Sequence, residues 1–433
     1  MSNANKSSDW QSTSTFCAWS IVAAFCTYFC MYAFRKPFTA GFFLDAKLGD
    51  IDYFLDTKLG DLDYKTVLVI SQVFGYTLSK FIGIKVVSEI TAARRAQAIA
   101  VLIATAEVAL IVFALVPPPW NFPALFVNGL SLGMVFGMVL AYLEGRRLTE
   151  ALTAGLCASF VVSSGVVKSV GSYLIEFGVS EYWMPATTGL IFAPPLFISI
   201  WMLTRIPPPN PDDIEHRSER VPLNREDRWR FFRRYSVGLS LLVIVYVALT
   251  TLRSVRDDFA VEIWRDLSGT TRPAVFAQTE TIVMIAVVTL NAATFLIVRN
   301  RTAFMMSLMI VIAGFGLVAG ASILQTTGMV GPFMFMVLSG IGLYTPYIAF
   351  HTTVFERMIA ASKNKANLGF LMYLADSSGY LGYVAVMLTD TFTDSKENML
   401  GFFITMSYVV SAASIVGILL AIAWFRRSLP NDE

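Results

Sequence analysis

Residues 16–43 read FCAWSIVAAFCTYFCMYAFRKPFTAGFF, an apolar run of 28 residues whose only charges are Arg35 and Lys36. A helix needs about 20 apolar residues to cross the hydrocarbon core of a bilayer, so this run predicts a transmembrane helix. Eleven similar segments follow it along the chain: 66–88, 97–116, 122–143, 151–175, 183–204, 236–260, 274–298, 304–325, 329–354, 366–389 and 399–425. We therefore expect an all-α polytopic membrane protein with twelve transmembrane helices.

The composition agrees with this fold class and argues against several others. Hydrophobic residues make up 55% of the 433 residues and charged residues 15%, whereas soluble proteins carry roughly 25% charged residues. The net charge of +2 argues against a nucleic-acid partner. The chain contains only two histidines, and no catalytic triad, zinc-binding or nucleotide-binding motif occurs in it. We therefore expect no enzymatic activity, no cofactor and no metal.

The charges of the loops predict the orientation. Twenty lysines and arginines lie in or beside alternate connections between the segments, against six in the opposite connections. The positive-inside rule then places both termini in the cytoplasm. The longest polar stretch, 205–234, predicts a basic cytoplasmic linker between two six-helix bundles, residues 1–204 and 235–433.

Ionisable residues inside the predicted spans are candidate functional residues, because each costs about 2.5–3.5 kcal/mol to insert. Arg35 and Arg253 are 218 residues apart, close to half the length of the chain. If the two halves are parallel repeats about a pseudo-twofold axis along the membrane normal, these arginines face each other near mid-depth. The alternative is that each arginine lies near a helix end and extends to the membrane surface.

Four more charged residues lie within spans: Lys80, Lys168, Glu280 and Asp376. Lys80 could instead reach the inner headgroups, and Lys168 could be a structural residue paired with an acid. Glu280 could neutralise Lys168, and Asp376 could neutralise Lys80.

The chemistry of arginine predicts the kind of ligand. The planar guanidinium binds phosphate or carboxylate with two parallel hydrogen bonds and stays charged at every relevant pH. Tyr28 and Tyr32 precede Arg35 by about two turns and one turn on roughly the same helix face, so they could offer hydroxyl groups to a bound anion. The alternative is that these aromatic rings only pack.

At these residues the chain resembles the major facilitator superfamily, and within it the branch of organophosphate:inorganic phosphate antiporters. The resemblance is carried by motifs in both halves: YFCMYAFRKPF (28–38), FGYTLSKF (74–81), Arg253 with Asp258, GLYTP (342–346) and SGYLG (378–382). The chain departs from the pattern at Lys168, where the branch has histidine, and at Thr250, where it has tyrosine. These departures favour a divergent bacterial family.

The resemblance implies a phosphate clamp formed by Arg35 and Arg253, assisted by Lys80. It implies that five tyrosines line the binding cavity: Tyr28, Tyr32, Tyr76, Tyr344 and Tyr380. It also implies that charge pairs across the two bundles are remade during transport. The candidate gating or coupling residues are Lys36 with Asp258, Lys168 with Glu280, and Asp376.

We therefore predict a secondary transporter that moves a small phosphorylated anion by alternating access, in exchange for phosphate. A proton-coupled carrier of a carboxylate or sugar acid remains an alternative, as does a sugar-phosphate sensor that does not transport. The expected partners are the anionic substrate and the lipid bilayer. The expected state is a monomer in the bacterial cytoplasmic (inner) membrane.

Overall fold

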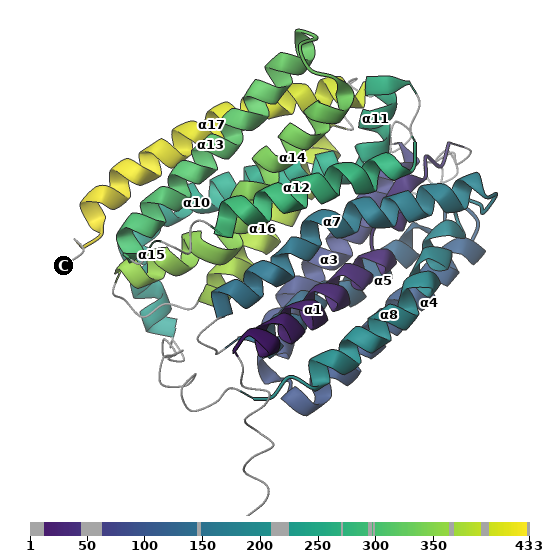
Figure 1. The fold of residues 1–433 in the computed structure, drawn as a ribbon, viewed down its shortest axis with the longest axis horizontal. Coiled ribbons are helices and arrows are strands. Elements are labelled where there is room, and N and C mark those ends of the chain that lie inside the picture. The colour runs from purple at the N-terminus through teal and green to yellow at the C-terminus, as the bar shows by residue number, and fades with distance from the viewer. Residues whose placement is uncertain are drawn as a thin grey trace, which may run out of the picture.

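The computed structural model describes residues 13–44, 63–144, 149–208, 225–269, 272–292, 297, 299–362, 368–390 and 398–430. Within these ranges the chain forms helices and no strand, and each of the twelve predicted segments coincides with helical structure (Figure 1). The predicted all-α class is therefore confirmed.

The helices up to residue 208 form the first half of the molecule. In chain order they are α1 (Thr13–Met31), the 3-10 turns η2 (Tyr32–Phe34) and η3 (Pro37–Ala40), α3 (Tyr64–Glu89), α4 (Ala92–Leu115), α5 (Phe122–Leu132), α6 (Val135–Leu143), α7 (Thr149–Glu176) and α8 (Met184–Thr204).

The helices from residue 225 onward form the second half. In chain order they are α10 (Arg225–Asp258), α11 (Ala260–Ser268), α12 (Ala274–Ala292), α13 (Asn300–Thr326), α14 (Pro332–Ala349), the π-helical turn η6 (Phe350–Val354), α15 (Phe355–Ser362), α16 (Leu368–Asp390) and α17 (Met399–Ser428). Most of the predicted linker, residues 209–224, lies outside the described residues, and the predicted division into two bundles stays a prediction.

Eleven helical segments within the described ranges are long and apolar enough to cross a membrane. The twelfth predicted span, α16, falls outside this set because Asp376 and the serines after it lower its hydropathy. Large apolar side chains on these helices are exposed, as expected for surfaces that face lipid. The chain is an integral multi-pass membrane protein.

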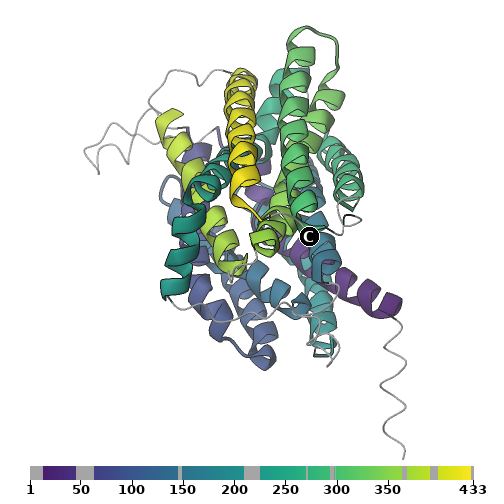
Figure 2. The ribbon, with the colours of Figure 1, turned by 90° about the vertical axis from the view of Figure 1, so that its left-hand side faces the viewer.

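The long helices run side by side, and the two halves meet along two main helix pairs (Figures 1 and 2). α7 packs on α12, and α3 packs on α16. Gly165 of α7 makes the first approach possible, since a Cβ atom there would lie 2.4 Å from the carbonyl oxygen of Phe276. Charged side chains at these two contacts are therefore enclosed between the halves.

The first predicted span, 16–43, is not one continuous helix. α1 ends at Met31, and two 3-10 turns carry the chain on to Ala40. Pro37 contributes to the break, because it has no N–H to donate to the carbonyl oxygen of Ala33, four residues earlier, and its ring crowds that carbonyl group. The break lies at the two buried charges, Arg35 and Lys36.

Candidate functional site

Two buried amide side chains hold the segment where α1 ends. Gln72 of α3 donates its Nε2 to the carbonyl oxygen of Arg35 at 2.6 Å, and Asn128 of α5 donates its Nδ2 to that of Phe34 at 2.8 Å. Gln72 also donates to Asn128 Oδ1 at 2.8 Å. Buried backbone carbonyl groups beyond the end of a helix have no partner within that helix, so they need hydrogen-bond donors from elsewhere. The amides therefore fix the backbone that carries Arg35.

The Arg35 side chain is buried, with 2% of its surface exposed. Its guanidinium carbon lies 3.7 Å from the centre of the Tyr76 ring, 5.6 Å from that of Tyr380 and 5.8 Å from that of Tyr32. Its Nε has no hydrogen-bond partner, and no carboxylate in the described ranges pairs with it. Arg35 is therefore a buried cation held against aromatic rings without a counterion.

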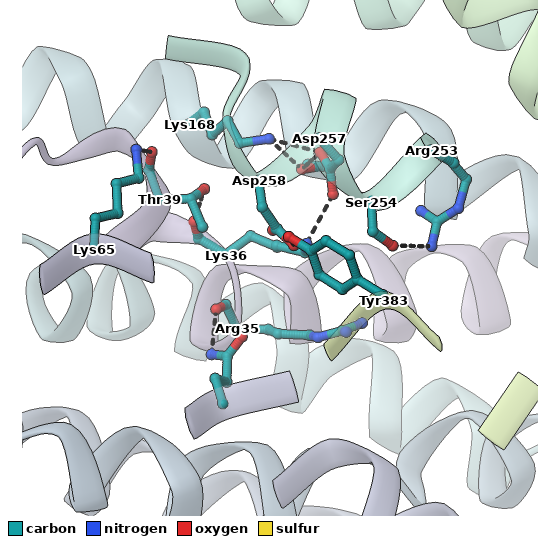
Figure 3. A network of polar contacts seen from close by, with 12 residues as sticks. Arg35, Lys36, Thr39, Lys65, Lys168, Arg253, Ser254, Asp257, Asp258 and Tyr383 are labelled. Atoms are coloured by element: carbon teal, nitrogen blue, oxygen red, sulfur yellow. Dashed lines mark hydrogen bonds and ion pairs between the residues drawn. The ribbon is translucent and has the colours of Figure 1, made fainter. Parts of the chain in front are cut away.

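Arg253 of α10 has the corresponding environment in the second half. It is 4% exposed, and its guanidinium carbon lies 4.3 Å from the Tyr347 ring centre and 5.8 Å from that of Tyr344. Among the described residues its one hydrogen bond joins Nη2 to Ser254 Oγ at 3.3 Å, and its Nε has none. Figure 3 shows the Arg253 side chain beside Ser254, its partner in this hydrogen bond.

The burial of both arginines contradicts the alternative in which they extend to the membrane surface. The rings beside the two arginines line one cavity: Tyr32, Tyr76 and Tyr380 lie beside Arg35, and Tyr347 lies beside Arg253. The two arginines thus act on one common tyrosine-rich region.

The buried lysines, in contrast, pair with carboxylates. Lys36 Nζ lies 2.8 Å from Asp257 Oδ2 and also contacts Asp258, so the predicted Lys36–Asp258 pair is formed (Figure 3). Lys80 Nζ lies 2.6 Å from Asp376 Oδ2, as predicted. In both pairs the lysine belongs to the first half and the acid to the second.

Lys168 does not pair with Glu280, which corrects the prediction. Its Nζ lies 2.6 Å from Asp257 Oδ1, and Glu280 Oε1 instead lies 2.8 Å from Arg256 Nη2. Asp257 also accepts a hydrogen bond from Ser164 Oγ at 2.5 Å. Asp257 follows Arg256 directly on α10, so one carboxylate can face α7 while the arginine reaches the acid on α12.

A small cavity lies where the tyrosines meet. Its volume is about 10 Å³, room for one water molecule. Its walls are Tyr28, Tyr32, Tyr76, Lys80, Phe136, Phe160, Tyr347, His351, Asp376 and Tyr380. Four of the five predicted lining tyrosines are among them. Tyr344 is not, and it packs beside Arg253 and Arg256 instead.

Several residues at the site were not predicted from the sequence. His351 and Tyr246 both contact Asp376, and Asp257 and Arg256 complete the charge cluster near α7. His351 lies inside an apolar segment, and that position alone could have identified it. Arg256 and Asp257 are adjacent to Asp258 in the sequence, and the sequence does not indicate which of these three residues contacts a neighbouring helix.

The buried charges at the interface leave a positive excess. Among the described residues, seven cations, Arg35, Lys36, Lys65, Lys80, Lys168, Arg253 and Arg256, face five carboxylates, Asp257, Asp258, Glu262, Glu280 and Asp376. The two uncompensated charges are those of Arg35 and Arg253. An anion is the ligand that such an arrangement can bind most strongly.

Comparison with solved structures shows which fold this is. The crystal structure of the nucleoside transporter NupG aligns with a TM-score of 0.58 at 13% identity, covering 95% of this chain and 99% of that chain. That of a D-xylose-proton symporter aligns with a TM-score of 0.60 at 12% identity, covering 94% and 96%. The chain therefore has the fold of the major facilitator superfamily.

No curated protein sequence matches the chain. A model of a protein family does match it, over residues 37–428. Because this range includes nearly all of the helical region, the chain belongs to the family described as "Family of unknown function (DUF5690)".

Proposed function

We propose that this protein is a secondary active transporter that moves a small phosphorylated anion by alternating access, in exchange for phosphate. One observation carries the proposal: each half contributes one buried arginine, Arg35 or Arg253, that has aromatic neighbours but no carboxylate partner within the described residues. A charge left unpaired in a low-dielectric interior is costly, so such a site is built for a ligand of opposite charge.

Phosphate suits these two arginines better than a neutral solute does. A guanidinium presents a planar fork of donors that matches two oxygens of one phosphate. The hydroxyl groups of the cavity tyrosines and the ammonium group of Lys80 can donate to the remaining oxygens. The cavity is too small for a phosphate group, so binding requires the side chains of the two halves to move apart. Motion of this kind is what alternating access requires.

The charge balance favours exchange over free return of the empty carrier. A phosphate monoester carries about −1.5 to −2 charges at neutral pH, which offsets the two charges of Arg35 and Arg253. The loaded interface is then nearly neutral, whereas the empty one keeps two unpaired cations in a low-dielectric region. We expect the loaded carrier to reorient quickly and the empty carrier slowly.

The resemblance to organophosphate antiporters supports the substrate class, and the transport activity in the names of both aligned structures supports the mode of action. The loop charges support an orientation with both termini in the cytoplasm, and the resemblance to a divergent bacterial family supports a bacterial cytoplasmic membrane. The proposal needs only one chain, since both arginines belong to it.

Proteoliposomes test the proposal directly. Purified protein is reconstituted, and uptake of labelled inorganic phosphate is measured into vesicles that contain unlabelled phosphate or none. We expect rapid uptake only with phosphate on both sides. Phosphate binding without uptake would replace the transporter with a sensor. Uptake into anion-free vesicles that follows a pH gradient would replace exchange with proton symport.

A further inference from the structure

We propose that an arginine cluster at the predicted cytoplasmic end of the second half binds the headgroup of an anionic phospholipid. The cluster consists of seven arginines at the ends of four helices: Arg233 and Arg234 of α10, Arg299 and Arg301 at the start of α13, Arg357 of α15, and Arg426 and Arg427 of α17. Five of them are exposed, and Arg301 and Arg357 are half-buried. The cluster lies apart from the candidate site, because Arg253 follows Arg234 by 19 residues of one helix, roughly 28 Å along its axis.

Direct contacts bring three of these helices together at the cluster (Figure 1). Arg301 donates from Nη2 to the carbonyl oxygen of Arg426 at 3.0 Å, so the start of α13 meets the end of α17. The ring centre of Trp424, two residues before Arg426, lies 6.2 Å from that of Tyr235 of α10. Tyr235 directly follows Arg234, whose guanidinium carbon lies 5.7 Å from the centre of the Tyr235 ring. Arginines that are distant in the sequence are therefore neighbours in the fold.

A third guanidinium group joins the start of α13 from α15. Arg357 donates from Nη1 to Asn300 Oδ1 at 2.8 Å, and Asn300 lies between Arg299 and Arg301 in the sequence. The start of a helix is the positive end of its dipole and repels cations. No acidic residue lies in the first turn of α13 to offset this repulsion. The stability of α13 therefore does not explain why arginines gather there.

The positive-inside rule does not explain the cluster either, because it acts on both halves alike. Among the side chains that the structure describes at this end, the second half has seven arginines and one carboxylate, that of Glu356, an excess of six positive charges. The first half has an excess of two, from four cations and two carboxylates: Lys85, Arg94, Arg95 and Arg205 with Glu89 and Glu144. The second half thus presents a concentrated positive surface, which favours an anionic partner.

The residue types at the cluster and below it favour a phospholipid. All seven cations are arginines, and a guanidinium can bind two oxygens of one phosphate group. Next to the cluster, α10 and α17 carry exposed apolar side chains: Val237 and Ile244 on α10, and Val416 and Leu420 on α17. A phospholipid can place its phosphate on the arginines and its acyl chains on these side chains. A free phosphate ion can use the arginines alone.

Native mass spectrometry of the purified 433-residue chain tests the proposal. The method counts the lipid molecules bound to each protein molecule and gives an apparent dissociation constant for the first one. The probes are phosphatidylglycerol, which is anionic, and phosphatidylcholine with the same acyl chains. Two double variants alter the cluster on different helices: Arg233→Gln with Arg234→Gln, and Arg426→Gln with Arg427→Gln.

The matched control is Arg94→Gln with Arg205→Gln, which removes two exposed cations from the same end of the first half. We expect the parent to bind phosphatidylglycerol more tightly than phosphatidylcholine by more than about tenfold. A basic residue near a membrane surface contributes roughly fivefold in affinity for anionic lipid, so each cluster variant should lose about twenty-fivefold. The control should keep the parental affinity. The two cluster variants remove arginines of different helices, so the test stays decisive if one variant does not fold.

Equal affinity of the parent for the two lipids would overturn the proposal. Equal losses in the control and in the cluster variants would also overturn it, because they would show a diffuse effect of surface charge. Glycerophosphoglycerol, which is the same headgroup without acyl chains, is the competitor. If it displaces phosphatidylglycerol at equal concentration, the ligand is a soluble phosphate compound and the lipid assignment is wrong. None of these outcomes depends on phosphate transport, so the proposed function is tested separately.

Discussion

The guanidinium carbon of Arg35 lies 3.7 Å from the centre of the Tyr76 ring, and the ring supplies no negative charge to neutralise it. A desolvated cation over an aromatic face gains up to about 2 kcal/mol, which is less than a buried charge costs. Tyr76 therefore positions the guanidinium of Arg35 through the face of its ring and leaves the N–H donors along the edge of the guanidinium available. Lys80, one turn along the same helix, is neutralised by Asp376 at 2.6 Å. Of these two neighbouring cations, Lys80 therefore already has a carboxylate partner, whereas Arg35, which follows η2, has none among the described residues.

The amides of Gln72 and Asn128 are expected to position Arg35. Gln72→Leu or Asn128→Leu leaves a buried carbonyl group at the end of α1 without its donor, at a cost of about 1–3 kcal/mol. We expect lower thermal stability and weaker phosphate binding by calorimetry. Ser131→Ala is the matched control, because Ser131 Oγ donates within its own helix to the carbonyl oxygen of Val127. Equal losses in all three variants would show that the amides have no special role.

The pairing of Lys168 can be tested with double-mutant cycles. Asp257→Asn removes a carboxylate that pairs with both Lys36 and Lys168. Breaking a buried ion pair by removing one partner costs about 3–5 kcal/mol of stability. We expect a coupling energy of about 0.5–3 kcal/mol between Lys168→Met and Asp257→Asn in unfolding measurements. The matched cycle with Glu280→Gln should give a smaller value. A larger coupling energy in the cycle with Glu280→Gln would show that Lys168 pairs with Glu280 and not with Asp257.

Lys65 and Glu262 join the two halves near the start of α3. Their Nζ and Oε1 atoms lie 2.5 Å apart, and Lys65 also donates to the carbonyl oxygen of Thr39 at 2.8 Å. In a background without the four native cysteines, Lys65→Cys with Glu262→Cys should be bridged by a short bifunctional thiol reagent. We expect the bridge to stop phosphate exchange, and a cleavable reagent should allow recovery. Full exchange in the bridged protein would mean that this contact does not open during transport.

The predicted orientation in the membrane can be tested by labelling single cysteines. Asp56 lies in a predicted outer loop and Arg220 in the predicted cytoplasmic linker. In intact cells a membrane-impermeant thiol reagent should label Asp56→Cys and not Arg220→Cys, and broken cells should allow both. Labelling of both in intact cells would contradict the predicted orientation.

Much of the fold could be predicted from the sequence, because hydropathy and length are local properties of each segment. Each of the twelve apolar segments contains a membrane-length run of helical structure or, for 16–43, a helix followed by two 3-10 turns, within the described residues. The break after Met31 was not predicted, since apolar residues continue on both sides of Arg35 and Lys36. It depends on Pro37 and on two amide donors, Gln72 and Asn128, that come from distant helices.

The sequence identified most charged residues of the candidate site, but it identified fewer of the ion pairs that they form. Arg35, Lys36, Lys80, Arg253 and Asp376 stand out as charges within apolar segments, which the sequence alone reveals. Which acid each lysine meets depends on the rotation of α7, α10 and α12 about their axes. Adjacent positions such as Arg256 and Asp257 face different helices, and a charge pattern does not specify those faces.

The central claim is that Arg35 and Arg253 bind the anion through their guanidinium groups. Arg35→Lys and Arg253→Lys keep the charge and remove the planar fork, and Arg205→Lys, at an exposed position, is the control. The decisive measurement is the initial rate of phosphate exchange in proteoliposomes as a function of phosphate concentration. Loss of one charge-assisted contact costs about 1.5–3 kcal/mol, so each of the two variants should lose roughly ten- to a hundredfold in apparent affinity while Arg205→Lys stays at the parental value. Parental affinity and rate in either Arg35→Lys or Arg253→Lys would contradict the account.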